Sequence, residues 1–369
     1  MKRRDVIKGG LGIVASVVAP SAFGETCPPT MGGTNPVNCP LPPAPTGGAI
    51  ESLASSMSPG SWQQLTTTSG LNSITANYLN GTYGSQQGNR GFFEYATRGI
   101  WLPNRAELHF RGSGHQSIGI HIKYSEATGE WTYLSSHSGW EHQYDHTAYD
   151  SQNDRLYAKK PAGRTIYRWQ VSSGAGNWTT AQSLPQQPEI ATGLAWFPDT
   201  NGGAGGLVHH DSPDRGPLQI SNPNVSSWRN VSTSAINSRS AYHTNAVYLP
   251  AQGVVLFGGG DNSGNRAAIL YPDDSTESRN NLPAYWGASD NNWMGTVLAD
   301  EVTGRIFFVT AQRDRIYEHD FNADSWTSIS NTPNLSQRSF ATMISSYGCI
   351  MLVEGSSTDT SPNIWLYKI

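Results

Sequence analysis

The run GWEHQYDHTAYD contains two imidazoles, a phenol and a carboxylate within the five positions from His142 to His146. Imidazoles exchange protons near neutral pH, and phenols and carboxylates commonly assist them. Because side chains alternate along a strand, His142, Tyr144 and His146 would share one side, with Gln143 and Asp145 on the other. His142 stands at the start of this strand and can take part in chemistry. His146 lies roughly 13 Å further along and is expected to pack inside the fold.

Residues of the same kinds occur at other points of the chain. SGHQS contains His115, and SAYHT contains Tyr242 beside His243. A histidine can remove a proton, a tyrosine can return one, and an arginine can neutralise a carboxylate. The predicted catalytic residues are His115, His142, Tyr144, Tyr242 and His243. The predicted substrate-binding residues are Arg164, His209, Arg215, Arg239, Asn292, Trp293, Arg313 and Arg338.

The elements that must position these residues repeat along the chain. Similar short runs open with Trp131, Trp178, Trp228 and Trp326, and STESRN around Glu277 fills the register without a tryptophan. The spacings are 47, 50, 49 and 49 residues. Three more short apolar runs, separated by Gly, Pro, Asn and Asp, complete each repeat. Four strands per repeat predict an all-β chain folded as a β-propeller, in which the tryptophans pack sheet on sheet.

The repeat also predicts the number of blades and how the ring closes. The last repeat ends at Ile369 after three strands, and GSWQQL at Trp62 matches the missing fourth. We therefore predict a six-bladed β-propeller of four-stranded antiparallel blades over residues 60–369, with an N-terminal strand closing the ring. Residues 70–92 are predicted to form a long loop rich in Gly, Asn and Ser.

A propeller would gather the candidate side chains at one face. The first strand of each blade begins there, and the turn between the second and third strands returns to it. We call this the funnel face. Six of the ten histidines fall on or next to it, namely residues 115, 142, 146, 209, 210 and 243. His, Arg, Lys and Tyr gathered at one mouth of an acidic chain indicate a site for an anionic or hydroxyl-rich ligand.

The repeats resemble the Kelch family over residues 60–369. The third strand of a blade contains tyrosine, the fourth opens with tryptophan, and VVLFGGGDN at residues 254–262 has the typical glycine pair. The central domain of galactose oxidase is of this type, and its copper chemistry depends on a tyrosine–cysteine crosslink. Cys349 lies in the apolar run YGCIMLVEG and is expected to be a buried strand residue, so we do not expect that chemistry here.

A second resemblance concerns residue types at the funnel face. Exported propellers that cleave ulvan and related uronate polysaccharides are similar in having a histidine in the inner turn of one blade, as in SGHQS, with further His, Tyr and Arg around the funnel. The resemblance implies β-elimination, with His115, His142 and His243 as candidate bases and Tyr144 and Tyr242 as candidate acids. Arg164, Arg215 and Arg239 would then be the carboxylate partners.

Other reactions fit the sequence less well. A serine hydrolase is disfavoured because no GxSxG motif is present. Glycoside hydrolysis stays open, since Glu94, Glu189, Asp211, Asp261 and Glu354 stand at the funnel face on different blades. A calcium site at Asp261 and Asn262 would have few ligands, and there are no CxxC pairs, so we predict neither a metal nor a cofactor. A non-catalytic glycan-binding propeller is the alternative from another functional class.

The N-terminal segment MKRRDVIKGGLGIVASVVAPSAFG resembles a twin-arginine export signal, spanning residues 1–24. Residues 25–59 would be a Pro/Gly-rich tail with a disulfide between Cys27 and Cys39. The formal net charge is −4, and removal of the signal's +3 would leave −7. An acidic chain argues against nucleic acid as a partner. We expect a monomer, periplasmic or extracellular and not bound to a membrane after signal removal, that acts on an anionic polysaccharide or oligosaccharide.

Overall fold

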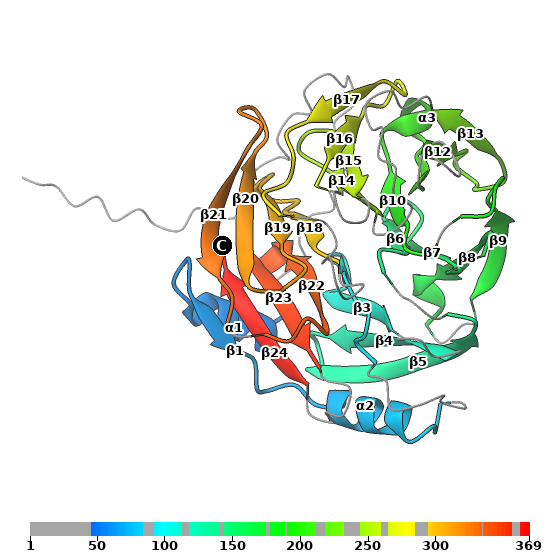
Figure 1. Ribbon diagram of the computed structural model, residues 1–369. Helices are drawn as coiled ribbons and strands as arrows, with labels where there is room; N and C mark the ends of the chain where they lie inside the picture. Colours follow the sequence, from blue (N-terminus) through cyan, green and yellow to red (C-terminus); the bar gives the residue numbers. More distant parts are fainter. Residues whose placement is uncertain are drawn as a thin grey trace, which may run out of the picture.

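Six four-stranded antiparallel sheets arranged in a ring form a six-bladed β-propeller, as predicted (Figure 1). The computed structural model describes residues 46–83, 92–112, 118–140, 144–161, 163–174, 178–188, 190–211, 218–231, 244–259, 265–284, 294–333, 335–355 and 362–369. The signal proposed for residues 1–24 and the disulfide proposed between Cys27 and Cys39 both lie outside the described residues.

Consecutive strands form each of the first five blades, from the innermost strand outward. The first three blades comprise β2 (Ile100–Leu102), β3 (Glu107–Gly112), β4 (Ile118–Ser125) and β5 (Glu130–Ser138); β6 (Thr147–Asp150), β7 (Arg155–Lys159), β8 (Thr165–Gln170) and β9 (Thr179–Ser183); and β10 (Gly193–Phe197), β11 (Gly206–His210), β12 (Leu218–Ser221) and β13 (Trp228–Val231). The next two comprise β14 (Thr244–Leu249), β15 (Val254–Gly259), β16 (Ala267–Leu270) and β17 (Thr276–Arg279); and β18 (Thr296–Ala299), β19 (Ile306–Val309), β20 (Arg315–Asp320) and β21 (Ser325–Asn331).

The sixth blade joins the two ends of the chain. Its inner strands are β22 (Ser339–Ile344), β23 (Cys349–Glu354) and β24 (Asn363–Lys368), and its outermost strand is β1 (Trp62–Gln64). Trp62 pairs with Tyr367, and the Trp62 Nε1 donates to Ser330 Oγ of the fifth blade at 2.9 Å. The predicted closure of the ring by the tryptophan-containing N-terminal strand is confirmed.

The hydrophobic core lies between neighbouring blades rather than in one central mass. Both faces of most inner strands are covered, so strands such as β15 are buried along their whole length. Gly193, at the start of β10, shows how closely the blades approach. A β-carbon there would lie 2.4 Å from the main chain of Asn245 in the fourth blade. Cys349 is fully buried in β23, as expected, and burial raises the pKa of its thiol to about 12.

Two helices were not predicted. Residues 71–79, within the expected loop, form α2 (Leu71–Leu79), and residues 49–56, within the expected tail, form α1 (Ala49–Ser56). In α2 the buried side chains of Leu71, Ile74 and Tyr78 follow the three- and four-residue spacing of a helix. The prediction was wrong because this pattern is only nine residues long and ends in glycine-rich sequence. The short helices α3 (Thr200–Gly203), η1 (Val171–Ser173) and η2 (Ser345–Tyr347) lie in turns.

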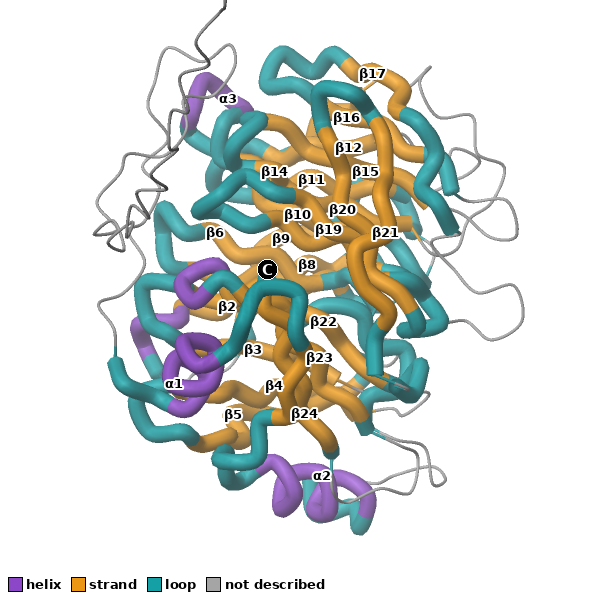
Figure 2. Tube along the Cα trace, turned by 90° about the vertical axis from the view of Figure 1, so that its left-hand side faces the viewer, coloured by secondary structure: helices purple, strands orange, loops and turns teal. Residues whose placement is uncertain are grey.

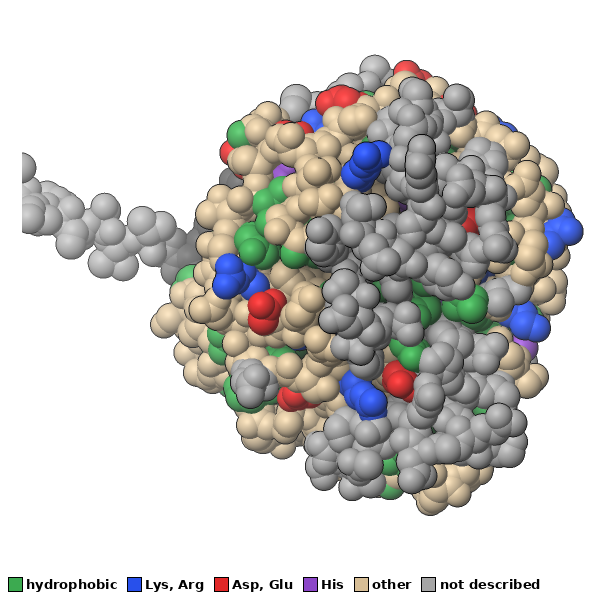
Figure 3. All heavy atoms as spheres, in the orientation of Figure 1, with side chains coloured by type: hydrophobic (Ala, Val, Ile, Leu, Met, Phe, Trp, Pro, Cys, Tyr) green, Lys and Arg blue, Asp and Glu red, His purple; other side chains and the backbone are tan. Residues whose placement is uncertain are grey.

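The ring has two faces. One is the funnel face, and the other carries the turns between the first and second strands of each blade; we call it the turn face. Helices α1 and α3 lie at the turn face, on the left of Figure 2, so Figures 1 and 3 look onto the funnel face. None of the helices in the described part of the chain is long and apolar enough to cross a membrane.

A buried carboxylate from the first blade caps α1. The N-cap residue of the helix, Gly48, has no side chain that could accept a hydrogen bond there. Glu126 accepts hydrogen bonds from the main-chain N–H groups of Ile50 at 3.2 Å and Glu51 at 2.8 Å, and from the Tyr124 hydroxyl at 2.7 Å. The negative charge also suits the positive end of the helix. Glu126 therefore fixes α1 onto the propeller.

Glu126→Ala is expected to lower the free energy of unfolding by about 2 kcal/mol, because it removes a helix cap and leaves the buried Tyr124 hydroxyl without this acceptor. Urea unfolding followed by tryptophan fluorescence would measure the change. Glu51→Ala is the matched control, since it removes a helix carboxylate that, among the described residues, accepts from the exposed Gly47 N–H alone. Equal effects of the two substitutions would contradict this role of Glu126.

Candidate functional site

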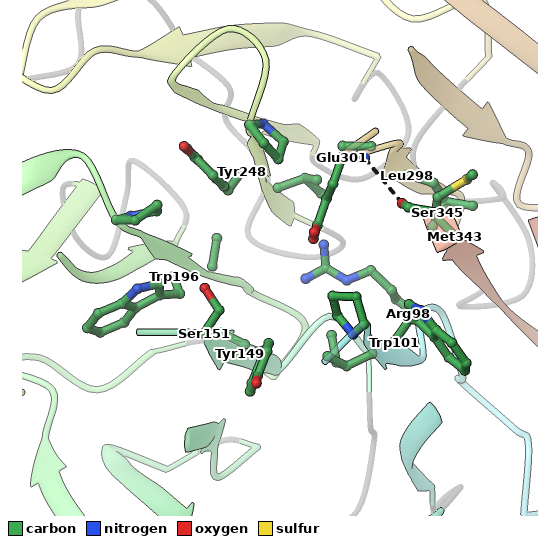
Figure 4. A pocket seen from close by; sticks show the side chains of 18 of the residues that line it. Arg98, Trp101, Tyr149, Ser151, Trp196, Tyr248, Leu298, Glu301, Met343 and Ser345 are labelled. Carbon is green, nitrogen blue, oxygen red and sulfur yellow. Dashed lines mark hydrogen bonds between the residues drawn. The ribbon is translucent and has the colours of Figure 1, made fainter. Parts of the chain in front are cut away.

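A cavity of about 1070 Å³ opens in the centre of the turn face (Figure 4). All six blades line it, each through residues at the end of its first strand and in the turn that follows. One position of that turn is equivalent in every blade and lines the cavity throughout. It is occupied by Pro103, Ser151, Pro198, Pro250, Glu301 and Ser345.

An ion pair between the first and second blades lies beside this cavity. Arg98 Nη2 is 2.7 Å from Asp145 Oδ1, and the two side chains are 11% and 1% exposed. Asp145 Oδ2 also accepts from the main-chain N–H of Ala246 in the fourth blade at 3.1 Å. Burial raises the pKa of Asp145 to about 6, while Arg98 and the Ala246 N–H oppose the rise. The pair thus links three blades across the axis of the ring.

The guanidinium of Arg98 also approaches main-chain oxygens. Its Nη2 lies 3.4 Å from Thr147 O in the second blade and 3.3 Å from Leu194 O in the third. Figure 4 shows the guanidinium pointing into the cavity. We find no hydrogen bond from Arg98 Nη1 to any described residue, so this nitrogen is available to a ligand.

Acidic groups stand on the wall formed by the third, fourth and fifth blades. The Tyr248 hydroxyl donates to Asp199 Oδ2 at 2.7 Å. Burial raises the pKa of this tyrosine, and the charges of Asp199 and Glu301 raise it further. The Glu301 main-chain N–H donates to Ser345 Oγ at 3.2 Å, which directs the side chain inward (Figure 4). Tyr248 therefore lies within the electrostatic reach of two carboxylates.

Glu301 reaches the water in the cavity although protein surrounds it. The residue is exposed, yet this enclosed environment raises the pKa of its carboxyl to about 7, and nearby Asp300 adds to the rise. A carboxyl with such a pKa can be either a proton donor or an acceptor near neutral pH. Among the described residues, none donates a hydrogen bond to its carboxylate.

A group of buried basic side chains lies inside the funnel-face end of the first three blades. Arg111 lies on the first blade, His146 and Lys159 lie on the second, and His209 lies on the third. Arg111 Nη2 donates to Lys159 O at 3.5 Å, and its guanidinium lies 4.0 Å from the Trp140 ring centroid. We call these four residues the basic layer.

The members of the basic layer affect one another. Burial lowers the pKa of Arg111 to about 9. It also lowers the pKa of His146 and His209 well below the usual range, and the charge of Lys159 depresses both further. Arg111 and His209 also act on His146. The positive charge inside the funnel-face end therefore comes from Arg111 and Lys159, because the lowered pKa values favour the neutral forms of His146 and His209. In Figure 3 the described Lys and Arg side chains on that face stand apart, so this charge lies beneath the surface.

Most of the predicted site residues lie outside the described residues. These are His115, His142, Arg215, Arg239, Tyr242, His243, Asn292 and Trp293. Of the predicted catalytic residues the structure describes Tyr144, which is 5% exposed and packs against Tyr95 with ring centroids 5.4 Å apart. Its catalytic role stays a prediction.

Four of the predicted substrate-binding residues are described. Arg164 is exposed and donates from Nε to Leu184 O at 2.6 Å. Arg338 Nη2 lies 4.0 Å from Glu94 Oε1. His209 is buried, with its Nε2 3.0 Å from Thr192 Oγ1. The structure brings His209 together with the other members of the basic layer, and leaves the exposed Arg164 and the partly buried Arg338 on separate blades.

The fourth, Arg313, is buried among main-chain oxygens of three blades. It donates to Thr310 O at 3.0 Å, to Ser339 O at 2.9 Å and to Ala96 O at 3.2 Å, and its Nε donates to Ser339 Oγ. Burial lowers its pKa to about 10. These bonds engage all three nitrogens, so the geometry gives Arg313 a structural role in joining blades. His146 is likewise buried, as expected, and its Nε2 accepts from the Thr192 N–H.

The sequence reasoning missed the turn-face cavity, and with it Arg98, Asp145 and Glu301. A signal existed for Glu301: in the aligned turns it is the acidic member of a register otherwise occupied by proline and serine. The described residues contain no group of three or more His, Cys, Asp or Glu that could hold a metal ion.

No model of a protein family matches this sequence, and no curated protein matches it. Solved structures do resemble it. A structural-genomics protein of unknown function from Bacteroides thetaiotaomicron has a TM-score of 0.54 at 13% identity, over 84% of this chain and 76% of that chain.

Two further solved structures have named activities. Virginiamycin B lyase from Staphylococcus aureus has a TM-score of 0.45 at 11% identity, over 84% of this chain and 88% of that chain. A fungal alcohol oxidase of the AA5 family, in complex with copper, has a TM-score of 0.45 at 10% identity, over 78% and 76%. The Bacteroides structure supports the propeller fold. None of the three assigns an activity to this chain.

Proposed function

We propose that this protein is an exported, carbohydrate-active propeller that binds an anionic glycan at its funnel face and cleaves it by β-elimination. The basic layer supports the proposal. Arg111, Lys159 and His209 come from three consecutive blades. Burial disfavours the charged form of Arg111, and burial together with repulsion by Lys159 disfavours the charged form of His209. An anion bound above them would relieve that repulsion. The Kelch-type repeats and the residue types shared with propeller lyases add support by resemblance alone.

The proposed reaction assigns a role to each predicted residue. His115, His142 or His243 would remove the proton beside the uronate carboxylate, while Arg164, Arg215 or Arg239 neutralises that carboxylate. The electrons form a carbon–carbon double bond as the glycosidic oxygen leaves. Tyr144 or Tyr242 would give that oxygen its proton. Of the other predicted residues, Asn292, Trp293 and Arg338 would hold neighbouring sugars, whereas His209 belongs to the basic layer and Arg313 joins blades.

The remaining expectations belong to the same proposal. The chain would be exported by its twin-arginine signal, and would act in the periplasm or outside the cell, as a monomer without cofactor, metal or nucleic acid. The second candidate function is glycan binding without cleavage. The burial of Tyr144 against Tyr95 favours it, since a tyrosine in that packing is poorly placed to reach a leaving oxygen.

The test uses purified mature chain on a panel of uronate glycans, with the ultraviolet absorbance of the unsaturated product as readout. His142→Ala and His243→Ala are each expected to lower the rate by roughly 10²- to 10⁴-fold while glycan binding persists. His137→Ala, on the outer strand β5, is the matched control and should leave the rate unchanged.

The outcomes separate the candidates. Binding without unsaturated product from any glycan would show that the protein is a binding module and overturn the proposed cleavage. New reducing ends without ultraviolet absorbance would instead indicate a hydrolase. Absence of binding to every uronate glycan would overturn the anionic-glycan proposal as a whole.

A further inference from the structure

Two charged groups project into the turn-face cavity, and their side chains point toward one another. Glu301 enters from the fifth blade and Arg98 from the first (Figure 4). Neither the Glu301 carboxylate nor the Arg98 Nη1 is hydrogen-bonded to another described residue. The cavity volume of about 1070 Å³ is that of a small-molecule site. A ligand there would meet an unused acceptor and an unused donor.

The balance of charge along the cavity wall favours a cation. The charge of Arg98 is offset by Asp145 at 2.7 Å, so this pair is close to neutral. Asp199 and Glu301 both act on the Tyr248 hydroxyl from the same side of the ring. The Arg98 guanidinium points toward Glu301 (Figure 4), but neither carboxylate forms an ion pair with a described cation. A positively charged group placed near Tyr248 would meet two carboxylates and the face of an aromatic ring.

The rest of the lining is suited to hydroxyl groups. Ser151, Gln152 and Asn104 contribute hydroxyl and amide groups from the first two blades. The Tyr149 hydroxyl is engaged with Asp154 Oδ1 at 3.1 Å, which leaves its ring to pack against apolar ligand surface. Aromatic rings, amides and hydroxyls in one cavity are complementary to the apolar and hydroxyl-bearing faces of a sugar ring.

We propose that the turn-face cavity is a binding site for an amino sugar, with the ligand's ammonium group between Glu301 and Asp199 and its hydroxyls towards Arg98 and the second blade. The site lies at the opposite end of the ring from the funnel face, and the proposal does not depend on the proposed function. The ligand is a small cation with hydroxyls, whereas the funnel face is proposed to bind an anionic polymer.

The protonation of Glu301 predicts how binding depends on pH. The charged and titratable groups that face it are Asp300 on its own turn, Tyr248 on the fourth blade, Asp199 on the third, Tyr149 on the second and Arg98 on the first. Its pKa of about 7 means that the empty cavity holds a largely neutral carboxyl at pH 5. An ammonium binds the ionised form, so affinity should rise from pH 5 to about pH 7, with release of a proton on binding.

The test is isothermal titration calorimetry of the full chain with glucosamine, glucose and N-acetylglucosamine. These probes share the sugar ring and differ at one substituent, and only glucosamine carries an ammonium group. Glucosamine is expected to bind at least roughly tenfold more tightly than either neutral sugar at pH 7. Its affinity should fall on lowering the pH to 5. Equal binding of the three probes, or absence of glucosamine binding, would overturn the proposal.

Glu301→Gln keeps the shape of the side chain and the main-chain bond to Ser345, so the fold should persist. It is expected to remove most of the preference for glucosamine and its pH dependence. Glu277→Gln, on the outer strand β17, is the matched control and should change neither. Unchanged preference in Glu301→Gln would also overturn the proposal. His142→Ala should bind glucosamine normally, so failure at one face is distinguishable from failure at the other.

Discussion

Asp145→Asn is expected to lower the free energy of unfolding by about 3 kcal/mol, even though it changes only one oxygen to nitrogen. The substitution leaves the guanidinium of Arg98, which is 11% exposed, without its counter-charge. It also weakens the acceptor for the Ala246 N–H, because the amide carries no negative charge. Three blades meet at this ion pair, so the cost falls on their packing around the axis.

Removal of the cation instead of the carboxylate should destabilise the fold by an amount that depends on pH. Arg98→Met leaves Asp145 buried without a cation, and the carboxyl can then take up a proton. The pKa of Asp145 is about 6 in the folded wild type, above its ordinary value. Its contribution to stability is therefore full below pH 4 and is lost as the pH rises through 6. Without Arg98 this loss should increase and extend to higher pH, so Arg98→Met should be more destabilising at pH 8 than at pH 5.

Urea unfolding at the two pH values measures both effects. The matched control is Asp154→Asn, which breaks the more exposed pair with Arg105 and should cost less than about 1 kcal/mol. The double variant Arg98→Met/Asp145→Asn should be less destabilising than the sum of the two single changes, because it removes both charges together. A wild-type unfolding midpoint for Asp145→Asn would show that the pair does not hold the blades together.

The sequence predicts the architecture well because the repeat is a physical requirement of the fold. Each blade must pack a large aromatic against the next sheet, so the spacing of Trp131, Trp178 and Trp228 reveals the blade length. The equivalent position at Glu277, which lacks a tryptophan, and the tryptophan at Trp62 then determine the number of blades and the strand that closes the ring. By contrast, α1 and α2 each occur once, and their short apolar patterns gain meaning only from the blade surfaces on which they pack.

The candidate sites are harder to predict, because a blade alignment shows register and not depth. The alignment places Asp145 on the opposite side of the strand from His142. It does not show that the Asp145 carboxylate lies at the axis beside Arg98, which is 47 positions earlier in the chain. The alignment places Arg313 at the funnel face. It does not show that the guanidinium is buried among main-chain oxygens that accept its hydrogen bonds. Burial arises from neighbouring blades, so residue type and register alone cannot separate a ligand-binding arginine from a structural one.

A chain that begins at residue 66 is expected to be at least about 5 kcal/mol less stable than one that begins at residue 46. The longer chain keeps α1, β1 and the residue that follows β1. Its additional buried side chains include Ile50 of α1, with no exposed surface, and Leu65 directly after β1, which is 4% exposed. Burial of each contributes about 1.5–3 kcal/mol, and Trp62 adds its contact with Tyr367 and its bonds to the fifth blade. Domains of this kind are stable by only about 5–15 kcal/mol in total, so the loss approaches the whole margin.

The expected result is a melting temperature lower by roughly 10 °C or more, together with self-association. Without β1 the ring stays open at the sixth blade, and β24 presents unpaired N–H and C=O groups to other chains. Thermal unfolding by circular dichroism and size-exclusion chromatography would measure the two effects. Gln64→Ala in the longer chain is the control, because Gln64 is exposed and this substitution should leave β1 paired with β24. Equal melting of the two chains, with both monomeric, would mean that contacts between the first and sixth blades alone hold the ring closed.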